Sequence, residues 1–386
     1  MDIRRPKLLE FFAGGGLARL GLAEHFDCVL ANDIDPMKCG AYRANFGDSD
    51  LHEGDIWTLE PAELPTADLA WASFPCQDLS LAGARAGLQA KRSGAFWGFW
   101  RLIEGLEAEG RAPPIIALEN VAGLLSSNKG QDFAALMSVL AGAGYRAGAF
   151  LFDARLLVPQ SRPRLFIVGY KGQPPEELLS PAPCEPFHTR PVVAAYEGLD
   201  EAAKAAWAWW RLPTPPARNT TLDALLERSP PASAWQSEAK LNAMLQRMTP
   251  AHRARVEDAA ARGDFSVGAV YRRIRIEDGQ RRQRAEVRYD GLAGCLRTPA
   301  GGSSRQFLMV SEAGETKLRL LTGREAARLM GCEDAYILPD RESAALKVMG
   351  DGVCVPVVRW IGAHLLSPLA AARPEAKPGT KVDVAA

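Results

Sequence analysis

The 386-residue chain lacks any uninterrupted apolar run approaching the roughly 18 residues that a membrane-spanning helix needs. Its first residues lead directly into a strand-like segment, without the apolar stretch of a signal peptide. It has no internal repeat, and its 46 basic residues equal its 46 acidic ones, so total charge indicates no particular partner. We therefore expect a globular, cytoplasmic protein that does not associate with a membrane.

Cysteine is scarce and scattered. The seven cysteines are odd in number and include no C-x-x-C pair, which disfavours both a disulfide framework and a zinc ribbon. Two common nucleotide-binding signatures are also missing, the G-x-G-x-x-G of dinucleotide sites and the G-x-x-x-x-G-K-[ST] phosphate loop. These absences disfavour nicotinamide chemistry, and we expect free thiols and no bound metal.

What the chain does contain is an alternation of short apolar runs and helix-like segments over its first 170 residues. Such an alternation is typical of a largely parallel sheet with helices on both faces, here a doubly wound, Rossmann-like α/β fold. The expected strands are 7–12, 28–31, 68–73, 115–118 and 165–170, and the expected helices between them are 17–24, 96–109 and 131–141.

The pattern changes at a Pro-rich passage that begins at residue 171, where neither a helix nor a central strand can persist. We predict a first domain from 1–170 plus 316–368, a smaller domain from 171–315 and a disordered tail from 369–386. The second domain should hold a helix over 201–211, with the nearby tryptophans packed against other structure. Helical sequence returns at 323–330 and 355–366.

Charge is uneven within the second domain. From Tyr271 to Arg305 there are nine arginines and four acidic residues. A solvated face is the ordinary interpretation of such a run, and binding to a phosphate backbone is the functional one.

Polar and glycine residues follow the expected strands at the edge where open parallel sheets bind ligands. Gly14, Gly15 and Gly16 would let a ligand approach the backbone closely, although a tight turn is the simpler interpretation. Asp33 follows the second strand and could accept hydrogen bonds from ribose hydroxyls. Asp55 could bind an adenine amino group, or it could cap a helix. Phe12 could face a cation. Together these features fit S-adenosylmethionine, a nucleoside that carries a positive sulfonium.

Cys76 lies between two strand-end residues, Pro75 and Gln77. An isolated cysteine is usually a small buried apolar residue, but a thiolate could also add to carbon 6 of cytosine and make carbon 5 nucleophilic. Glu119 could neutralise the charge on the base, best as a buried carboxyl of raised pKa. Arg162 and Arg164 could brace Glu119 or the base carbonyl, or form an ordinary surface salt bridge.

The order of these segments resembles the DNA cytosine-5 methyltransferase family, over about residues 7 to 367. The segments that carry the resemblance are Phe12-Ala13-Gly14-Gly15-Gly16, Asn32-Asp33, Gly54-Asp55-Ile56, Pro75-Cys76-Gln77, Glu119-Asn120-Val121, Gln160-x-Arg162-x-Arg164, Arg319-Leu320-Leu321-Thr322-x-Arg324-Glu325 and Gly350-x-x-Val353. The resemblance implies S-adenosylmethionine as methyl donor, Cys76 as nucleophile, and Glu119 and Arg164 as partners of a cytosine flipped out of duplex DNA.

The resemblance also implies that the first domain, 1–170 plus 316–368, is the catalytic, S-adenosylmethionine-binding one and that the domain from 171–315 recognises the DNA target. Further site residues follow from it. It implies that the cofactor also contacts Ile34, Ile56, Pro75, Asp351 and Val353. The residues expected to contact DNA are Gln77, Ser80, Arg92, Arg272, Arg273, Arg297, Gly301 and Gly302. A monomer is expected, associated with the nucleoid, and a cognate restriction endonuclease acting separately is a possible functional partner.

The sequence departs from the family pattern at two positions that bear on ligands. Asp351 stands where the family usually has Asn, which could weaken contacts to the carboxylate end of the cofactor or disfavour a cofactor with an extra carboxylate. Cys295-Leu296 replaces the usual Thr-Leu pair, so a hydroxyl contact to phosphate is missing.

Two alternatives remain open. A tRNA cytosine-5 methyltransferase shares the catalytic plan, although the long region from 171 to 315 favours duplex DNA. A catalytically inactive DNA-binding protein is disfavoured by the intact Pro75-Cys76-Gln77 and Glu119-Asn120-Val121 segments. An amino-methyltransferase would need an Asn/Asp/Ser-Pro-Pro-aromatic loop, which the chain lacks.

Overall fold

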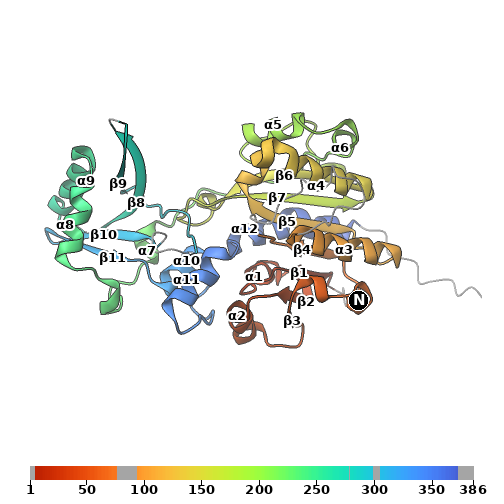
Figure 1. The fold of residues 1–386 in the computed structure, drawn as a ribbon, viewed down its shortest axis with the longest axis horizontal. Helices are drawn as coiled ribbons and strands as arrows, with labels where there is room; N and C mark the ends of the chain where they lie inside the picture. The colour runs from red at the N-terminus through yellow and green to blue at the C-terminus, as the bar shows by residue number, and fades with distance from the viewer. Residues whose placement is uncertain (1–4, 76–93, 278, 299–304, 373–386) are drawn as a thin grey trace, which may run out of the picture.

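The computed structural model describes residues 5–75, 94–277, 279–298 and 305–372. In Figure 1 the chain forms two parts, a larger one around a seven-stranded sheet and a smaller one around a four-stranded sheet. Helices α10 to α12 lie between the two sheets in this view.

The larger sheet has the strand order β3-β2-β1-β4-β5-β7-β6. β7 runs antiparallel to both of its neighbours, β5 and β6. The predicted doubly wound α/β fold is therefore confirmed. Its strands are β1 (Lys7–Phe11), β2 (Asp27–Asp33), β3 (Leu51–Glu53), β4 (Leu69–Ala72), β5 (Ile115–Val121), β6 (Tyr145–Asp153) and β7 (Pro163–Lys171). Strands β3 and β6 were not among the predicted ones.

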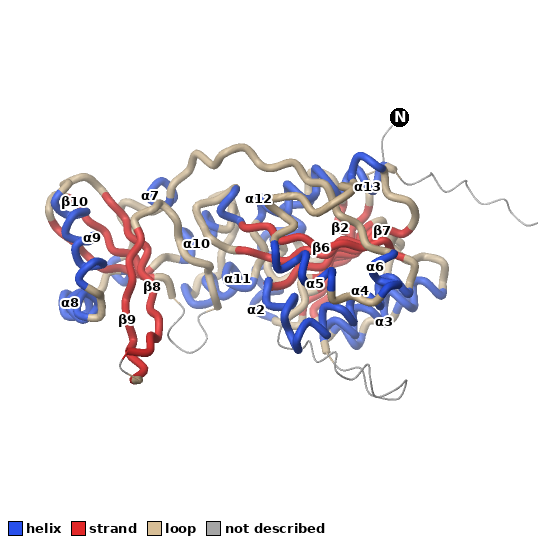
Figure 2. Tube along the Cα trace, turned by 90° about the horizontal axis from the view of Figure 1, so that it is seen from above, coloured by secondary structure: helices blue, strands red, loops and turns tan. Residues whose placement is uncertain are grey.

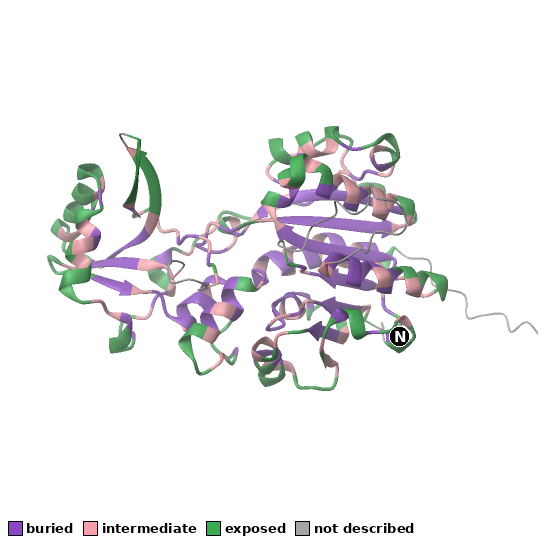
Figure 3. Ribbon diagram, in the orientation of Figure 1, coloured by how far each residue is buried: buried purple, intermediate pink, exposed green. Residues whose placement is uncertain are grey.

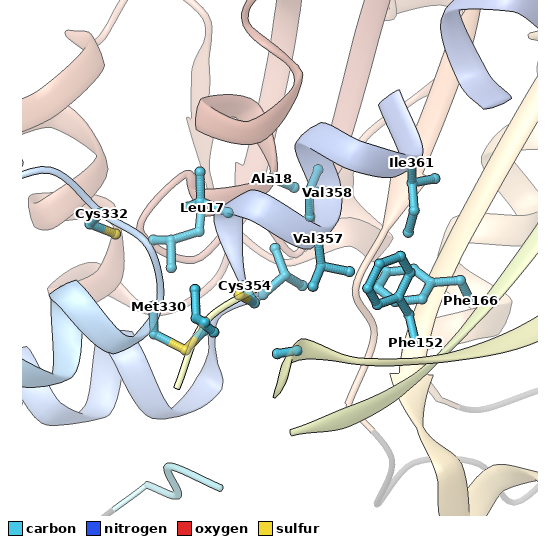
Figure 4. Packing of buried hydrophobic residues seen from close by; sticks show 14 of the residues in the cluster. Leu17, Ala18, Phe152, Phe166, Met330, Cys332, Cys354, Val357, Val358 and Ile361 are labelled. Carbon is cyan, nitrogen blue, oxygen red and sulfur yellow. The ribbon is translucent and has the colours of Figure 1, made fainter. Parts of the chain in front are cut away.

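Helices cover both faces of this sheet, because apolar side chains on each buried strand point alternately to the two sides. Ile115 and Ala117 face a core shared with α1 and α12, whereas Ile116 and Leu118 face a core shared with α3 and α4. Figure 4 shows part of the first core, where Val357 and Ile361 of α12 lie beside Phe166 of β7. The helices of this part are α1 (Leu17–Leu22), α2 (Pro36–Phe46), α3 (Ala95–Ala108) and α4 (Gln131–Gly142).

The Trp-rich passage after residue 171 packs on the larger sheet. Trp210 is fully buried and its indole N–H donates to the Val168 carbonyl at 2.9 Å, while Trp207 pairs with Ala147 of β6. The predicted packing role of these tryptophans is confirmed, but the predicted helix over 201–211 is wrong beyond Ala205, because this backbone then bonds to a strand edge. The helices here are α5 (Arg190–Glu197) and α6 (Glu201–Ala205).

The smaller sheet is antiparallel, with the order β11-β10-β8-β9. Its strands are β8 (Ser266–Glu277), β9 (Gln280–Arg288), β10 (Phe307–Glu312) and β11 (Glu315–Leu320), so this sheet extends past the predicted boundary at 315. Met244, Met248 and Val256 of the helical layer pack on one of its faces. That layer comprises α8 (Glu238–Gln246) and α9 (Pro250–Ala261), and the short α7 (Leu222–Leu225) precedes it.

The motif around Arg319 and Glu325 builds the junction between the two parts. The two side chains are 1% and 0% exposed and form paired hydrogen bonds of 2.7 and 2.8 Å. Glu325 also closes a capping box with Thr322 at the start of α10. This ion pair is therefore structural, and it fixes the angle at which the chain leaves β11.

The chain returns to the larger part through α10 (Gly323–Leu329), α11 (Glu342–Asp351), α12 (Val355–Ile361), a π-helical turn (Gly362–Leu366) and α13 (Ser367–Ala371). Leu369 is fully buried, so the predicted tail boundary at 369 falls inside folded structure. Within the described ranges one helical run, Glu342–Ala371, is long and apolar enough to cross a bilayer by length and composition. Of its most apolar window 56% is buried inside the molecule, as is typical of a core helix.

Short 3-10 turns complete the described elements. They span Ile56–Thr58 (η1), Pro61–Glu63 (η2), Ala122–Gly130 (η5), Ala154–Leu156 (η6), Glu176–Leu178 (η7) and Ala232–Ala234 (η8).

Candidate active site

A cavity of about 480 Å³ opens at the carboxyl ends of β1, β2, β4 and β5, with α11 as a further wall. This is the edge of the sheet from which the sequence predicted ligand contacts. Nine of the predicted site residues line it: Phe12, Gly14, Asp33, Ile34, Pro75, Glu119, Arg164, Asp351 and Val353.

The turn after β1 has an unusual backbone. Phe12 adopts a φ of 59°, which non-glycine residues rarely do, and Gly14 and Gly16 have φ values of 58° and 77°. Of the three predicted glycines only Gly14 lines the cavity. A Cβ at Gly15 would lie 2.5 Å from the Tyr336 hydroxyl, and one at Gly16 would lie 2.4 Å from the Phe46 ring. Gly15 and Gly16 therefore permit close packing.

Asp33 fixes the turn from the neighbouring strand. Its Oδ2 accepts a hydrogen bond from the Gly14 N–H at 2.8 Å, and its Oδ1 accepts one from the Asp35 N–H at 2.9 Å. Each carboxylate oxygen can accept a second bond, so the side chain retains capacity toward the cavity. Ile34 is 63% exposed beside it and offers an apolar surface.

Asp55 and Ile56 lie apart from this group, and neither is among the residues that line the cavity. Asp55 caps the η1 turn by accepting a hydrogen bond from the Trp57 N–H at 3.1 Å, the capping role that the sequence left open. Ile56 is buried and its side chain lies against the surface at Gly98 of α3.

Two ion pairs line the wall formed by α2 and α11. Lys38 Nζ lies 2.8 Å from Asp351 Oδ2, and Lys347 Nζ lies 2.5 Å from Asp35 Oδ2. The negative charge at the position where the family usually has Asn is therefore offset by a lysine on the facing helix. This pairing could not be predicted from the sequence, because the two residues are far apart in the chain.

Glu119 and Arg164 meet across the antiparallel β5–β7 pair. Arg164 Nε lies 3.0 Å from Glu119 Oε1, and the two side chains are 16% and 9% exposed. Burial raises the pKa of the Glu119 carboxyl, and the charges of Arg164 and Arg162 and a hydrogen bond with Ser73 partly oppose that rise. The predicted partnership of Glu119 with Arg164 thus has the expected geometry.

Asn120, which we did not predict as a site residue, holds the end of β4. Its side-chain amide donates to the Phe74 carbonyl at 3.0 Å, immediately before the Pro75-Cys76-Gln77 segment. This bond fixes the strand end from which that segment departs. The feature of the sequence that could have identified Asn120 is its position directly after Glu119, an acidic residue at the end of a predicted strand.

Arg162 has a different set of partners from those predicted. It is 1% exposed, and its guanidinium donates to the carbonyls of Leu296 at 2.8 Å, Gly350 at 3.0 Å and Gly352 at 2.6 Å. It therefore links the segment that follows β9 to the C-terminal end of α11. It does not line the cavity.

Glu10 also lines the cavity, although the sequence analysis passed over it. It is 1% exposed in the middle of β1, and its Oε2 has no hydrogen-bond partner. Burial raises the pKa of this carboxyl to about 8. The signal in the sequence was an acid inside the apolar run Leu8-Leu9-Glu10-Phe11.

Of the remaining predicted residues, three lie within the described part of the chain and away from the cavity lining. Arg272 and Arg273 are on β8, and Arg297 is exposed beside the Gly350 backbone. Six predicted residues lie outside the described part of the chain: Cys76, Gln77, Ser80, Arg92, Gly301 and Gly302. In the described ranges no group of three or more His, Cys, Asp or Glu side chains is arranged to hold a metal ion.

Comparison with known proteins identifies the family. Residues 6–367 match the family described as C-5 cytosine-specific DNA methylase. The chain belongs to this family. It is a DNA cytosine-5 methyltransferase that uses S-adenosylmethionine.

Curated relatives agree with this assignment. The Type II methyltransferase M.NlaX of Neisseria lactamica is 27% identical over 369 residues, which cover 95% of this chain and 97% of the relative. The Type II methyltransferase M2.BsuMI of Bacillus subtilis is 36% identical over 176 residues, covering 45% and 44% of the two chains. The Dnmt2 methyltransferase of S. pombe superposes with a TM-score of 0.61 at 19% identity, over 95% of this chain and 99% of that one, and establishes likeness of fold.

Proposed function

We propose that this methyltransferase methylates carbon 5 of a cytosine flipped out of a specific duplex DNA sequence, with Cys76 as the covalent nucleophile. The observation that carries the proposal is the Glu119–Arg164 pair. It lines the same cavity as Pro75, the residue that directly precedes Cys76.

The base side of the proposed reaction uses Cys76 and Glu119. The Cys76 thiolate forms a bond to carbon 6. The π electrons of the carbon 5–carbon 6 double bond form a carbon 4–carbon 5 double bond, which is the enamine, and those of the carbon 4–nitrogen 3 bond move onto nitrogen 3. A protonated Glu119 bonded to ring nitrogen 3 offsets the negative charge that develops there, and its raised pKa favours that proton. Arg164 keeps the carboxyl in place and faces the base carbonyl. After methyl transfer, loss of the carbon 5 proton expels the thiolate and restores the double bond.

The cofactor side of the cavity fits S-adenosylmethionine. Asp33 has free acceptor capacity for ribose hydroxyls, Ile34 gives an apolar surface for adenine, and Phe12 presents a ring beside the glycine turn. The buried Oε2 of Glu10 and the Lys38–Asp351 pair provide polar groups for an amino-acid tail. When bound, the cofactor supplies a methyl group activated by its positive sulfonium.

Base flipping is part of the proposal because a nucleophile cannot reach carbon 6 inside a stacked duplex. Extrusion costs a few kcal/mol, which contacts elsewhere on the DNA must offset. The residues proposed to make such contacts include Gln77, Ser80 and Arg92, all outside the described residues.

A covalent trap tests the central claim. Duplex DNA that carries 5-fluorocytosine at the methylated position cannot lose a proton from carbon 5, so the enzyme should remain attached in the presence of cofactor. We expect a denaturant-resistant complex with the wild-type protein and none with Cys76→Ala. Cys184→Ala is a matched control, since Cys184 is not among the residues that line the cavity. Equal trapping by the Cys76 variant would refute the assignment.

The alternative substrate is tRNA, since the same catalytic plan can act on RNA. Methyl transfer from labelled S-adenosylmethionine should be measured on duplex DNA and on tRNA with the same enzyme preparation. Family membership supports DNA, and we expect transfer to duplex DNA to dominate. Activity on tRNA alone would overturn the proposal.

A further inference from the structure

The β8–β9 hairpin projects beyond the smaller sheet as a ribbon of two strands. β8 pairs with β10 only from Ser266 to Val270, whereas its pairing with β9 continues to Glu277. The ribbon extends away from the rest of this part in Figures 1 and 2, and its outer half is exposed in Figure 3.

One face of the ribbon is occupied by ion pairs within the hairpin. Arg273 Nε lies 3.5 Å from Glu286 Oε2, and Arg275 also pairs with Glu286. Arg284 pairs with Glu277 on the same face. The charges of these arginines are thus partly neutralised by acidic side chains of the same hairpin.

The opposite face of the ribbon carries apolar side chains in the core and also, exposed, beyond the core. Val270 and its cross-strand partner Val287 pack under the α8–α9 layer. Arg272 comes next on this face, with its guanidinium over the Phe307 ring. Beyond it, Ile274 pairs with Gln283 and Ile276 pairs with Arg281. Ile274 is 58% exposed and Ile276 is 78% exposed.

Exposed isoleucines on consecutive positions of one strand face are unfavourable unless a partner covers them. The charge of the hairpin indicates which partner. From Tyr271 to Arg288 there are seven arginines and three acidic residues, an excess of positive charge that complements a polyanion. The major groove of B-DNA is about 12 Å wide and admits a two-stranded ribbon.

We propose that the ribbon enters the major groove of the substrate DNA, with Ile274 and Ile276 packed against base edges and Arg281 and Arg282 on flanking phosphates. This inference rests on the proposed function, since it takes duplex DNA as the substrate. The two isoleucines then determine sequence preference, because apolar side chains distinguish the carbon 5 edge of pyrimidines. The two arginines contribute affinity that does not depend on sequence.

The experiment separates these roles by mutation. The recognised site is first mapped by bisulfite sequencing of DNA from cells that express the chain. Dissociation constants are then measured over a range of salt concentrations for a duplex with that site and for one of equal composition with the site scrambled. The variants are Ile274→Ser/Ile276→Ser, Arg281→Gln/Arg282→Gln and, as matched control, Ile337→Ser, which replaces a residue 54% exposed between α10 and α11.

We expect the isoleucine variant to lose about tenfold or more of its preference for the site and to keep its salt dependence. The arginine variant should keep its preference and lose about 0.9 from the salt slope for each phosphate contact. The Ile337 variant should match the wild type. Binding of S-adenosylhomocysteine by calorimetry should be unchanged in all of them, which shows that each is folded.

An isoleucine variant with unchanged preference would overturn this inference while leaving the proposed function intact. A wild-type protein that methylates no duplex DNA would instead overturn the proposed function itself, and the inference with it.

Discussion

Replacing Glu10 with Gln should stabilise the protein, and by an amount that grows with pH. The substitution replaces an ionisable side chain of β1 with one that stays neutral at every pH, and it changes the shape of the side chain very little. The acceptor that binds the Arg19 N–H at 3.2 Å is retained. The control is Glu197→Gln, at an exposed position of α5.

The magnitude follows from the pKa of the buried carboxyl, which burial raises from 4.5 to about 8. Below pH 4.5 the group is neutral in both the folded and the unfolded protein, so its stabilising contribution is fully present. As pH rises toward 8, the unfolded chain releases the proton and the folded protein keeps it, so stability is lost. At 1.36 kcal/mol for each tenfold change in proton concentration, the loss between pH 5 and pH 8 is about 3 to 4 kcal/mol.

The assay is urea denaturation of the Glu10→Gln variant and the wild type at pH 5, 6.5 and 8, without cofactor. The free energy of unfolding of the variant should exceed that of the wild type by a margin that widens by about 3 kcal/mol from pH 5 to pH 8. A margin that is constant with pH, or that matches the Glu197 control, would refute the claim that Glu10 is buried with a raised pKa.

Two further substitutions test the ion pairs. Glu119→Gln should preserve DNA binding in gel shifts and lower the single-turnover rate by about 10²- to 10⁴-fold, because the amide cannot supply a proton to the base; unchanged turnover would remove Glu119 from the mechanism. Glu325→Gln should cost about 3 to 5 kcal/mol of stability in urea denaturation, because it leaves the fully buried Arg319 without its counter-charge. The double variant Arg319→Met/Glu325→Leu should recover most of that loss, and an equally unstable double variant would contradict this explanation.

Periodicity in the sequence predicted most of the larger sheet, because central strands such as β1 and β5 are apolar on both faces and end at polar residues. It failed in the Trp-rich passage after Ala205, where the predicted helix does not continue. An Ala-rich segment has high helix propensity, but there the indole of Trp210 is buried against β7 and the backbone bonds to the edge of β6. Tertiary packing overrides local propensity in such a segment.

The lining of the cavity was predictable where its residues lie at the carboxyl ends of strands, as with Asp33 and Glu119. It was not predictable where partners come from distant segments. The Lys38–Asp351 pair joins two helices that are distant in the sequence and adjacent in the fold. The Glu10 Oε2 atom has no hydrogen-bond partner because the side chain is buried, and this burial cannot be predicted from the sequence. For Asp55 the sequence supported helix capping and ligand binding equally well. The structure shows the capping role, in which Asp55 accepts a hydrogen bond from the Trp57 N–H.

Arg162 joins the wall of the cavity at the C-terminal end of α11 to the segment that follows β9. Its guanidinium holds the carbonyls on both sides of Asp351, while Asp351 itself accepts a hydrogen bond from Thr298. A Cβ at Gly350 would lie 2.7 Å from the Arg297 carbonyl carbon, so the two backbones are in direct contact. Since Arg162 is buried and its donors bind backbone carbonyls, a movement of one segment must displace the other or leave buried polar groups unpaired. The same contacts that shape this wall of the cavity therefore fix the segment around Leu296 and Thr298 that follows β9.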